Sequence, residues 1–125
     1  MDEGEQRELL LDFEKNRQML MNISAQKQQV AMQLELTNAS LEELSKTKDK
    51  TVYKVVGNVL FPKDSKEMEK ELKERKETTE LRLKTVEKQE DNLIKKLNLI
   101  KTKIEGKDKE ESEDSKEEKN EKKKK

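Results

Sequence analysis

The chain has 125 residues, of which 46% are charged, 29% are hydrophobic and 2% are aromatic. A globular core draws on roughly 45–50% apolar residues, so this composition excludes an ordinary compact globule. A long helix needs only a narrow apolar stripe, which this composition can supply. Basic and acidic side chains number 29 each. Because the charges balance, the chain offers no steering field for nucleic acid or for an anionic membrane, and neither is predicted as a partner.

Several classes of enzyme are excluded by missing residue types. The sequence has no histidine, no cysteine and only three glycines. The commonest general acid–base residue, the thiolate metal ligands and a glycine-rich phosphate loop are therefore absent. We predict no catalytic residues, no metal and no cofactor. The acidic start of the chain is unlike a signal peptide, and no apolar run approaches the ~20 residues of a membrane span, so we expect a cytoplasmic protein.

Residues 5–46 are predicted to form the first long helix. They are rich in good helix formers and contain neither glycine nor proline. Asp2, followed by Glu5, can cap the start. Steps of three and four residues trace a coiled-coil seam, and eight of its eleven positions are apolar. The seam is Leu9, Phe13, Asn16, Leu20, Ile23, Lys27, Val30, Leu34, Thr37, Leu41 and Leu44. Its three polar members weaken it, although a polar seam residue can also fix the register of paired helices.

Residues 51–61 are predicted to form a β-hairpin. Two runs of β-branched and aromatic residues flank Gly57-Asn58, the signature of a two-residue primed turn in which Gly57 takes positive φ. We expect Pro62 to end the second strand, since it has no amide to donate. An isolated two-stranded hairpin is marginal in water, so this one needs strands from other subunits. The oligomerisation element is Val52, Tyr53, Val55, Val56, Gly57, Val59, Leu60 and Phe61.

Residues 64–105 are predicted to form the second helix, with Asp64 and Glu67 as a capping pair. Its seam is Leu72, Lys76, Thr79, Leu83, Val86, Glu90, Leu93, Leu97, Ile100 and Ile104. Oppositely charged pairs spaced four apart, such as Glu71 and Arg75, support the helix. The predicted fold is therefore mainly α: an antiparallel two-helix coiled coil with one β-hairpin at the turn. Residues 107–125 carry eight lysines and eight acidic residues, and we expect a disordered, solubilising tail.

The helix ends far from the hairpin carry more apolar residues than a two-stranded seam uses. These off-seam residues are Leu10, Leu11, Met19, Met21, Ile94 and Leu99. Exposed apolar patches mark interaction surfaces, and methionine adapts to partners of variable shape. One hypothesis is that these ends bind exposed apolar segments of unfolded proteins. The alternatives are a third helix packed at the same place, or an ordinary scatter of surface apolar residues.

The order of elements resembles the β-class subunit of prefoldin, especially the archaeal kind. The family pattern Tyr-Lys-x-Val-Gly-x-x-Leu is carried by Tyr53, Lys54, Val56, Gly57 and Leu60. The stretches 25–29 and 77–90 are similar to the first and second helices of the family. The resemblance covers roughly residues 5–105, and the hairpin is its most specific part.

The resemblance implies a chaperone that holds non-native proteins without ATP and delivers them to a group II chaperonin. It also implies a heterohexamer of two α-class and four β-class subunits, whose hairpins build intersubunit β-barrels. The client-binding positions would include Leu9, Leu10, Phe13, Met19, Leu20, Leu97, Ile100 and Ile104. Two other functions remain open at this point, a structural coiled-coil scaffold and a filament-forming prefoldin relative.

Overall fold

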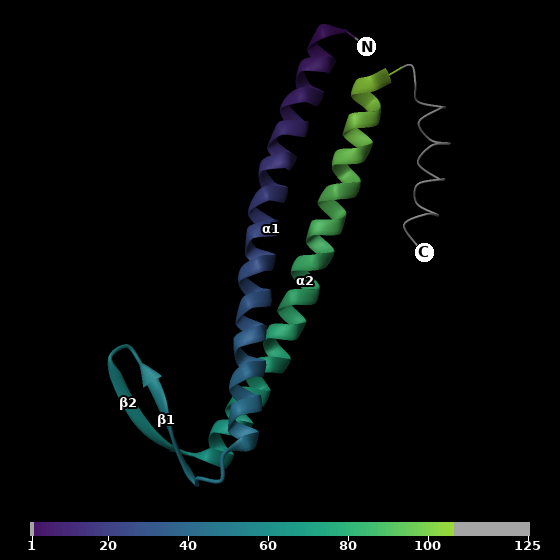
Figure 1. Ribbon diagram of the computed structural model, residues 1–125. Helices are drawn as coiled ribbons and strands as arrows, with labels where there is room; N and C mark the ends of the chain where they lie inside the picture. Colours follow the sequence, from purple (N-terminus) through teal and green to yellow (C-terminus); the bar gives the residue numbers. More distant parts are fainter. Residues whose placement is uncertain (1, 107–125) are drawn as a thin grey trace, which may run out of the picture. The chain divides into compact units, whose positions relative to one another are not determined.

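The computed structural model describes residues 2–106, in which two long helices flank a two-stranded sheet (Figure 1). The elements in chain order are α1 (Glu3–Lys46), β1 (Thr51–Val56), β2 (Val59–Asp64) and α2 (Ser65–Glu105). The predicted fold class, two long helices joined through one antiparallel β-hairpin, is confirmed. The tail expected to be disordered, residues 107–125, lies outside the described residues.

Acidic side chains cap both helices. The Asp2 carboxylate accepts a hydrogen bond of 2.7 Å from the Glu5 amide, and α1 begins at Glu3, two residues earlier than predicted. The Asp64 carboxylate accepts a bond of 3.3 Å from the Glu67 amide at the start of α2. A side-chain oxygen satisfies amides that have no partner within the first helical turn, so both predicted caps are confirmed.

The chain divides into two compact units. The first unit combines the start of α1, up to Ser24, with the end of α2, from Lys88 onward. The second unit, Ala25–Glu87, contains the remaining helix segments and the hairpin. In the second unit, one groove joins Gln33 and Thr37 to residues 75 and 79, and another joins Leu41 to Glu69. Within this unit, therefore, the two helix segments run antiparallel.

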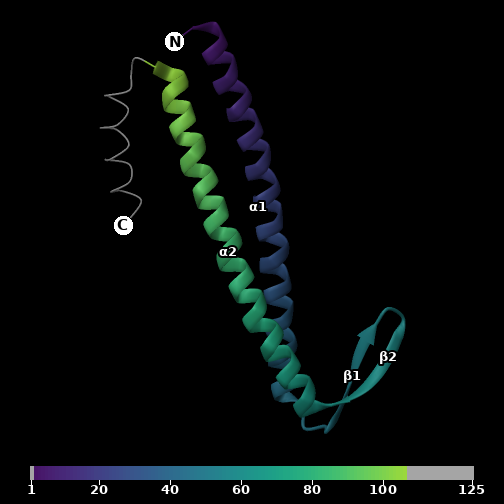
Figure 2. The ribbon, with the colours of Figure 1, turned by 180° about the vertical axis from the view of Figure 1, so that it is seen from behind.

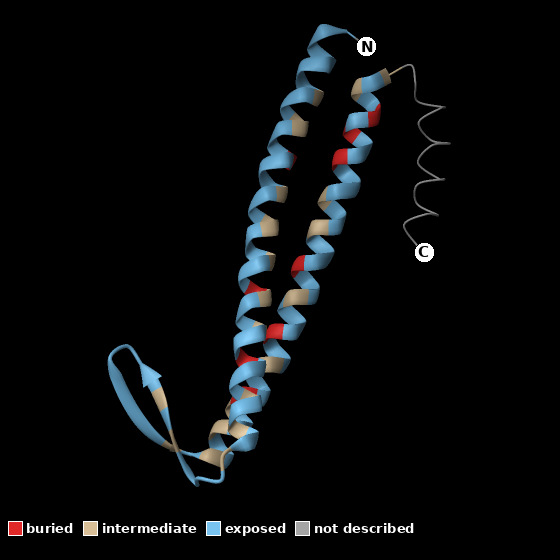
Figure 3. Cartoon of the chain, viewed as in Figure 1, coloured by how far each residue is buried: buried red, intermediate tan, exposed pale blue. Residues whose placement is uncertain are grey.

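Each unit has its own small core of buried side chains from both helices (Figure 3). Val30, Thr37, Leu72, Thr79 and Val86 are buried in the second unit, and Asn16, Leu97, Ile100 and Thr102 in the first. Eight of these nine lie on the predicted seam, and the exception is Thr102. The spacing of apolar residues therefore locates both cores.

Two buried polar seam residues are satisfied within their own helix. The Asn16 amide donates to the Asp12 carbonyl oxygen at 2.7 Å, and the Thr37 hydroxyl donates to the Gln33 carbonyl oxygen at 2.9 Å. Such backbone contacts remove the cost of burying an unsatisfied polar group. Because neither bond crosses to the partner helix, neither fixes the register of the pair directly.

The hairpin is longer than predicted. β1 and β2 pair antiparallel. The paired residues run from Val56 opposite Val59, beside the turn, to Thr51 opposite Asp64, so β2 continues through Pro62. The expectation that Pro62 ends the strand is therefore wrong. Gly57, with φ of 61°, is the only turn residue with positive φ, which corresponds to a type II′ turn.

Candidate interaction surfaces

The phase of the hairpin ladder explains how a proline fits inside β2. In an antiparallel pair, directly opposed residues alternate between hydrogen-bonded and non-hydrogen-bonded positions. Just outside the strands, the Ser65 amide donates to the Lys50 carbonyl oxygen at 2.7 Å, which marks a hydrogen-bonded pair. Counting inward along the register puts Tyr53–Pro62 at a non-hydrogen-bonded position. A backbone amide at this position would point away from β1. Pro62 has no amide, and this costs no hydrogen bond within the hairpin.

Both faces of the hairpin expose apolar side chains. One face presents Tyr53, Val55 and Leu60, each between 61% and 67% exposed. Val56, Val59 and Phe61 lie on the other face and are each about half exposed. Of the remaining predicted oligomerisation residues, Val52 is half-buried near the helices and Gly57 is in the turn. Two strands with this much exposed apolar surface are only marginally stable alone.

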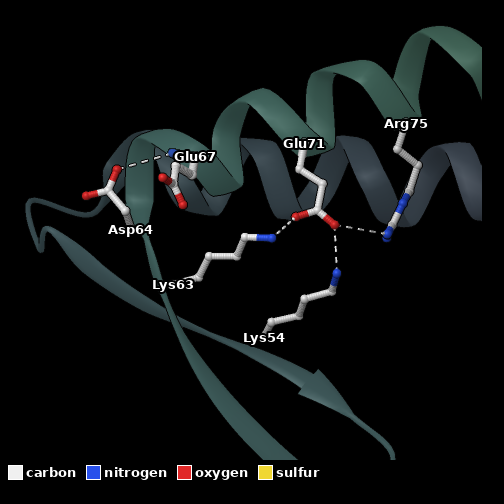
Figure 4. Close-up of polar contacts among 6 residues, drawn as sticks. All are labelled: Lys54, Lys63, Asp64, Glu67, Glu71 and Arg75. Carbon is white, nitrogen blue, oxygen red and sulfur yellow. Dashed lines mark hydrogen bonds and ion pairs between the residues drawn. The ribbon is translucent and has the colours of Figure 1, made fainter.

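One carboxylate ties both strands of the hairpin to α2 (Figure 4). Glu71 accepts hydrogen bonds of 2.6 Å from the Lys54 ammonium group of β1 and 2.5 Å from the Lys63 ammonium group of β2. The Arg75 guanidinium lies 3.8 Å from the same carboxylate. The side chains of Lys54, Lys63 and Glu71 are partly shielded from solvent, at only 28–32% exposed. Glu71 therefore fixes how the hairpin leaves the helix.

The bridging position of Glu71 changes its acidity. Hydrogen bonds from Lys54 and then from Lys63 lower the pKa of the Glu71 carboxyl to about 2, against the opposing effect of burial. The carboxylate is therefore ionised at every physiological pH. Sequence spacing predicted only the Arg75 contact, because Lys54 and Lys63 lie 17 and 8 residues away in the chain. Only the hairpin register, which puts both lysines on one face, could have indicated the other two.

A groove of about 590 Å³ runs beside β1 in the second unit. Four consecutive β1 residues, 52–55, line one side of it. The end of α1 lines the other side, with Leu36, Ala39, Ser40 and Glu43 among its contributors. Met68, Leu72 and Arg75 of α2 complete the lining. The groove is therefore bounded by a strand and by a helix surface that mixes apolar and polar side chains.

The predicted client-binding residues fall into three groups in the first unit. Leu10 and Met19 are exposed, at 55% and 44%. Leu9, Phe13, Leu20 and Ile104 are half-buried. Leu97 and Ile100 are buried in the core of the unit. The exposed set also contains the other predicted off-seam residues, Leu11, Met21, Ile94 and Leu99. Only the exposed and half-buried residues can contact another protein while the helices stay paired.

The first unit also contains a groove that the sequence patterns did not indicate. Its volume is about 560 Å³, and it lies between the start of α1 and the end of α2. The lining residues are Glu5, Glu8, Leu9, Asp12, Thr102, Lys103 and Gly106. Three carboxylates thus lie near one half-buried leucine. The signal was available in the sequence, since Glu5, Glu8 and Asp12 recur at helical spacing on one face.

Within residues 2–106, no cluster of acidic, histidine or cysteine side chains is arranged to hold a metal ion. None of the helices in the same part of the chain is long and apolar enough to cross a membrane. The described residues present an open strand edge, exposed apolar side chains and two grooves.

A helix–hairpin–helix chain with an exposed β-hairpin is the architecture of a known class of chaperone subunit. The family model described as "Prefoldin subunit" matches residues 7–111. Prefoldin subunit beta of Archaeoglobus fulgidus is 42% identical over 86 residues, covering 68% of this chain and 74% of its own length. Its counterpart from Saccharolobus islandicus is 41% identical over 96 residues, covering 76% of each chain.

A solved structure agrees with these sequence matches. The crystal structure of the prefoldin beta subunit from Thermococcus strain KS-1 superimposes with a TM-score of 0.73 at 33% identity, covering 80% of this chain and 89% of that one. The chain belongs to the prefoldin family, whose members act as chaperones. The resemblance predicted from the hairpin motif is confirmed.

Proposed function

We propose that this chain is a β-class subunit of a non-enzymatic, ATP-independent holdase in the cytoplasm. Four copies join two α-class subunits through their β-hairpins. The first unit of each copy binds non-native client proteins, and the complex passes them to a group II chaperonin. No nucleotide is needed, because each contact is weak and opens quickly, while several linked subunits hold one client by avidity.

The observation that carries the client-binding proposal is the set of exposed apolar side chains in the first unit. Leu10, Leu11, Met21 and Leu99 are each 55–65% exposed on helices whose seam is already filled. Large apolar side chains at such exposure are available to a partner, and burying the exposed part of each one contributes roughly 1–2 kcal/mol. Methionine and leucine on a helix demand no fixed shape from the partner. An unfolded client meets these requirements.

Assembly is supported by the hairpin. Additional strands would bury its six exposed apolar side chains and would supply hydrogen bonds to its open strand edges. Other subunits can provide such strands. The exposed apolar residues of the first unit are not part of the hairpin, so assembly through the hairpin does not use them. In this proposal the hairpin binds other subunits, and the exposed apolar residues of the first unit bind clients.

The test uses the chain as it exists, in complex with an archaeal α-class prefoldin subunit. The variant Met21→Ser with Leu99→Ser removes two exposed apolar side chains from the first unit. Its matched control, Met32→Ser with Leu81→Ser, changes the same residue types on the same helices in the second unit, where both are also exposed. Light scattering measures how much complex is needed to delay aggregation of a guanidinium-unfolded client by half.

We expect the first-unit variant to require about tenfold more complex, because two apolar contacts per copy are lost. The control should stay within about twofold of the parent chain. Both variants should form complexes of unchanged mass, since neither alters the hairpin. Equal loss of protection in the two variants would refute a client site in the first unit.

A further inference from the structure

The described residues contain four methionines, two in each unit. Met19 and Met21 of the first unit are 44% and 55% exposed. In the second unit, Met32 is 62% exposed and Met68 is half-buried. Both ribbon views show the α1 segment up to Ser24 with only the α2 segment of the same unit beside it among the described elements (Figures 1 and 2). Met19 and Met21 are therefore accessible to small reagents in solution.

Met21 also has a polar neighbour that is held in place. The Arg17 guanidinium donates two hydrogen bonds to the Glu14 carboxylate, of 3.0 Å from Nε and 2.6 Å from Nη2. Such a paired contact fixes the plane of the guanidinium. The remaining nitrogen, Nη1, donates to the Met21 Sδ atom at 3.4 Å. A thioether sulfur is a weak acceptor, whereas a sulfoxide oxygen is a strong one, so Nη1 is placed to bind the oxidised side chain.

Oxidation by a peroxide converts methionine from an apolar into a polar side chain. The sulfur donates an electron pair to one oxygen of hydrogen peroxide, and an S–O bond forms as the O–O bond breaks. The hydroxide that leaves takes up the proton of the transferred oxygen and becomes water. The sulfur has lost two electrons and the peroxide has gained them. Methionine sulfoxide reductases reverse the change, so the modification is reversible.

We propose that Met19 and Met21 form a reversible oxidation site that weakens client binding by the first unit. The inference rests on the proposed function, since it supposes that the first unit binds clients. Oxidation makes two apolar side chains per copy polar, and Arg17 binds the new oxygen of Met21. An apolar client segment placed against these side chains would then bury polar groups that it cannot pair. Neither methionine belongs to the hairpin, so oxidation at this site leaves assembly unchanged.

The exposed leucines of the first unit set the size of the expected effect. Leu10, Leu11 and Leu99 are 55–65% exposed and have no sulfur to oxidise. They keep their apolar surface in the presence of peroxide, so client binding is weakened rather than abolished. A leucine at positions 19 and 21 would supply similar apolar area. Methionine at these two positions therefore makes one part of the client surface sensitive to oxidants, while the leucines keep the rest insensitive.

The closing experiment compares two double variants. Met19→Leu with Met21→Leu removes the proposed site, and Met32→Leu with Met68→Leu is the matched control in the second unit. Leucine conserves the apolar volume and resists oxidation. Each full chain is treated with hydrogen peroxide, catalase removes the peroxide, and the chain is assembled with an untreated archaeal α-class subunit.

Three measurements are made on each treated chain and on its untreated counterpart. Peptide mass spectrometry gives the oxidised fraction of each methionine, and native mass spectrometry gives the mass of the complex. Light scattering gives the amount of complex needed to delay aggregation of an unfolded client by half. The ratio of that amount after and before treatment is the effect of oxidation, and it does not depend on how a substitution alters the untreated chain.

We expect this ratio to be about ten for the parent chain and for the Met32→Leu, Met68→Leu control, because two apolar contacts per copy are lost in each. The Met19→Leu, Met21→Leu variant should stay below about two. Methionine sulfoxide reductases should return the treated parent to its starting value. In Arg17→Lys, which cannot form the paired contact with Glu14, nuclear magnetic resonance should find the oxidised Met21 methyl group more mobile than in the parent.

An equal ratio in the two double variants would overturn the proposal, as would full oxidation of Met19 and Met21 without loss of protection. Failure of these two methionines to oxidise would overturn it as well. A smaller complex mass after treatment would assign the effect to assembly instead. If the untreated parent complex gives no protection, the proposed function itself fails, and this outcome is separate from every result that concerns oxidation.

Discussion

The hairpin and the first unit expose similar amounts of apolar side chain but differ in their backbones. Val55 of the hairpin is 67% exposed and Leu11 of the first unit is 65% exposed. Leu11 lies inside α1, where the backbone groups bond within the helix, whereas Val55 lies on a strand edge with an open amide. A partner of the hairpin must therefore supply a strand in register. A partner of the helix surface needs only apolar side chains. Surfaces with equally exposed apolar side chains can therefore select one fixed partner, as in the hairpin, or many variable partners, as on the helices.

The exposed residues of both regions should contribute little to the stability of the fold. Replacing the buried Leu72 with alanine should lower the free energy of unfolding by about 2–4 kcal/mol, because it leaves a cavity in the seam. Leu81→Ala, at 61% exposed on the same helix, should change it by less than about 0.5 kcal/mol. Urea unfolding followed by circular dichroism measures both, and similar losses would mean that the exposed leucines are structural.

The hairpin side of the comparison is tested by making its exposed pair polar. Val55→Ser with Leu60→Ser should weaken assembly with an α-class subunit about 100-fold, since both side chains would be buried on association. Helix content and client-binding residues are untouched by this change. Analytical ultracentrifugation gives the dissociation constant, and an unaltered complex would exclude the hairpin faces from the interface.

The ion pairs of Glu71 should make the attachment of the hairpin to α2 sensitive to acid. The pKa of Glu71 is lowered from its ordinary value of 4.5 to about 2 by the two lysines. A carboxyl with a lowered folded-state pKa stabilises the fold above its ordinary pKa, and this contribution is lost as pH falls from about 4.5 toward 2. Unfolding of the parent chain should therefore show acid sensitivity in that range that is reduced in Glu71→Gln.

A control for this acid sensitivity is Glu69→Gln, whose carboxylate forms an ion pair of 2.8 Å with the exposed Lys73. Exposed pairs contribute little, so the acid profile of this variant should stay close to that of the parent. Paired spin labels on the hairpin turn and on α2 would add a structural readout. We expect the distance distribution to broaden in Glu71→Gln, and an unchanged distribution would show that the lysines do not orient the hairpin.

The smallest predicted effect lies in the first unit. The Ser24 hydroxyl donates to the Glu90 carboxylate at 2.7 Å, linking the two helices there. Ser24→Ala should lower the free energy of unfolding by about 1 kcal/mol, with no change in assembly. Ser45→Ala, whose hydroxyl bonds within α1, is the matched control and should cost less than about 0.5 kcal/mol. A loss of assembly in Ser24→Ala would mean that the two kinds of surface are not independent.

Sequence patterns predicted the helices, the hairpin turn and most of both cores, because these depend on local periodicity and turn chemistry. Thr37 and Thr79 were placed on the seam by spacing and are buried. Thr102 was missed because it is polar and lies between apolar seam positions. Its hydroxyl donates to the Asn98 carbonyl oxygen at 2.9 Å, a bond within the helix that offsets the cost of burial.

Two other features that sequence patterns missed depend on pairing between distant residues. Whether Pro62 breaks a strand depends on the phase of the ladder, which composition does not contain. The contacts of Glu71 with Lys54 and Lys63 depend on which face of the hairpin turns toward α2. The client-binding roles of the first-unit residues stay predictions, and burial now favours the exposed residues, such as Leu10, over buried ones, such as Ile100.

The most direct test of the account is the mass of the complex that this chain forms with a co-expressed archaeal α-class subunit. If the hairpin joins subunits while the first unit stays open to clients, native mass spectrometry should find a closed heterohexamer with four copies of this chain. A chain that remains at its own mass of 14.8 kDa in that mixture would contradict the account.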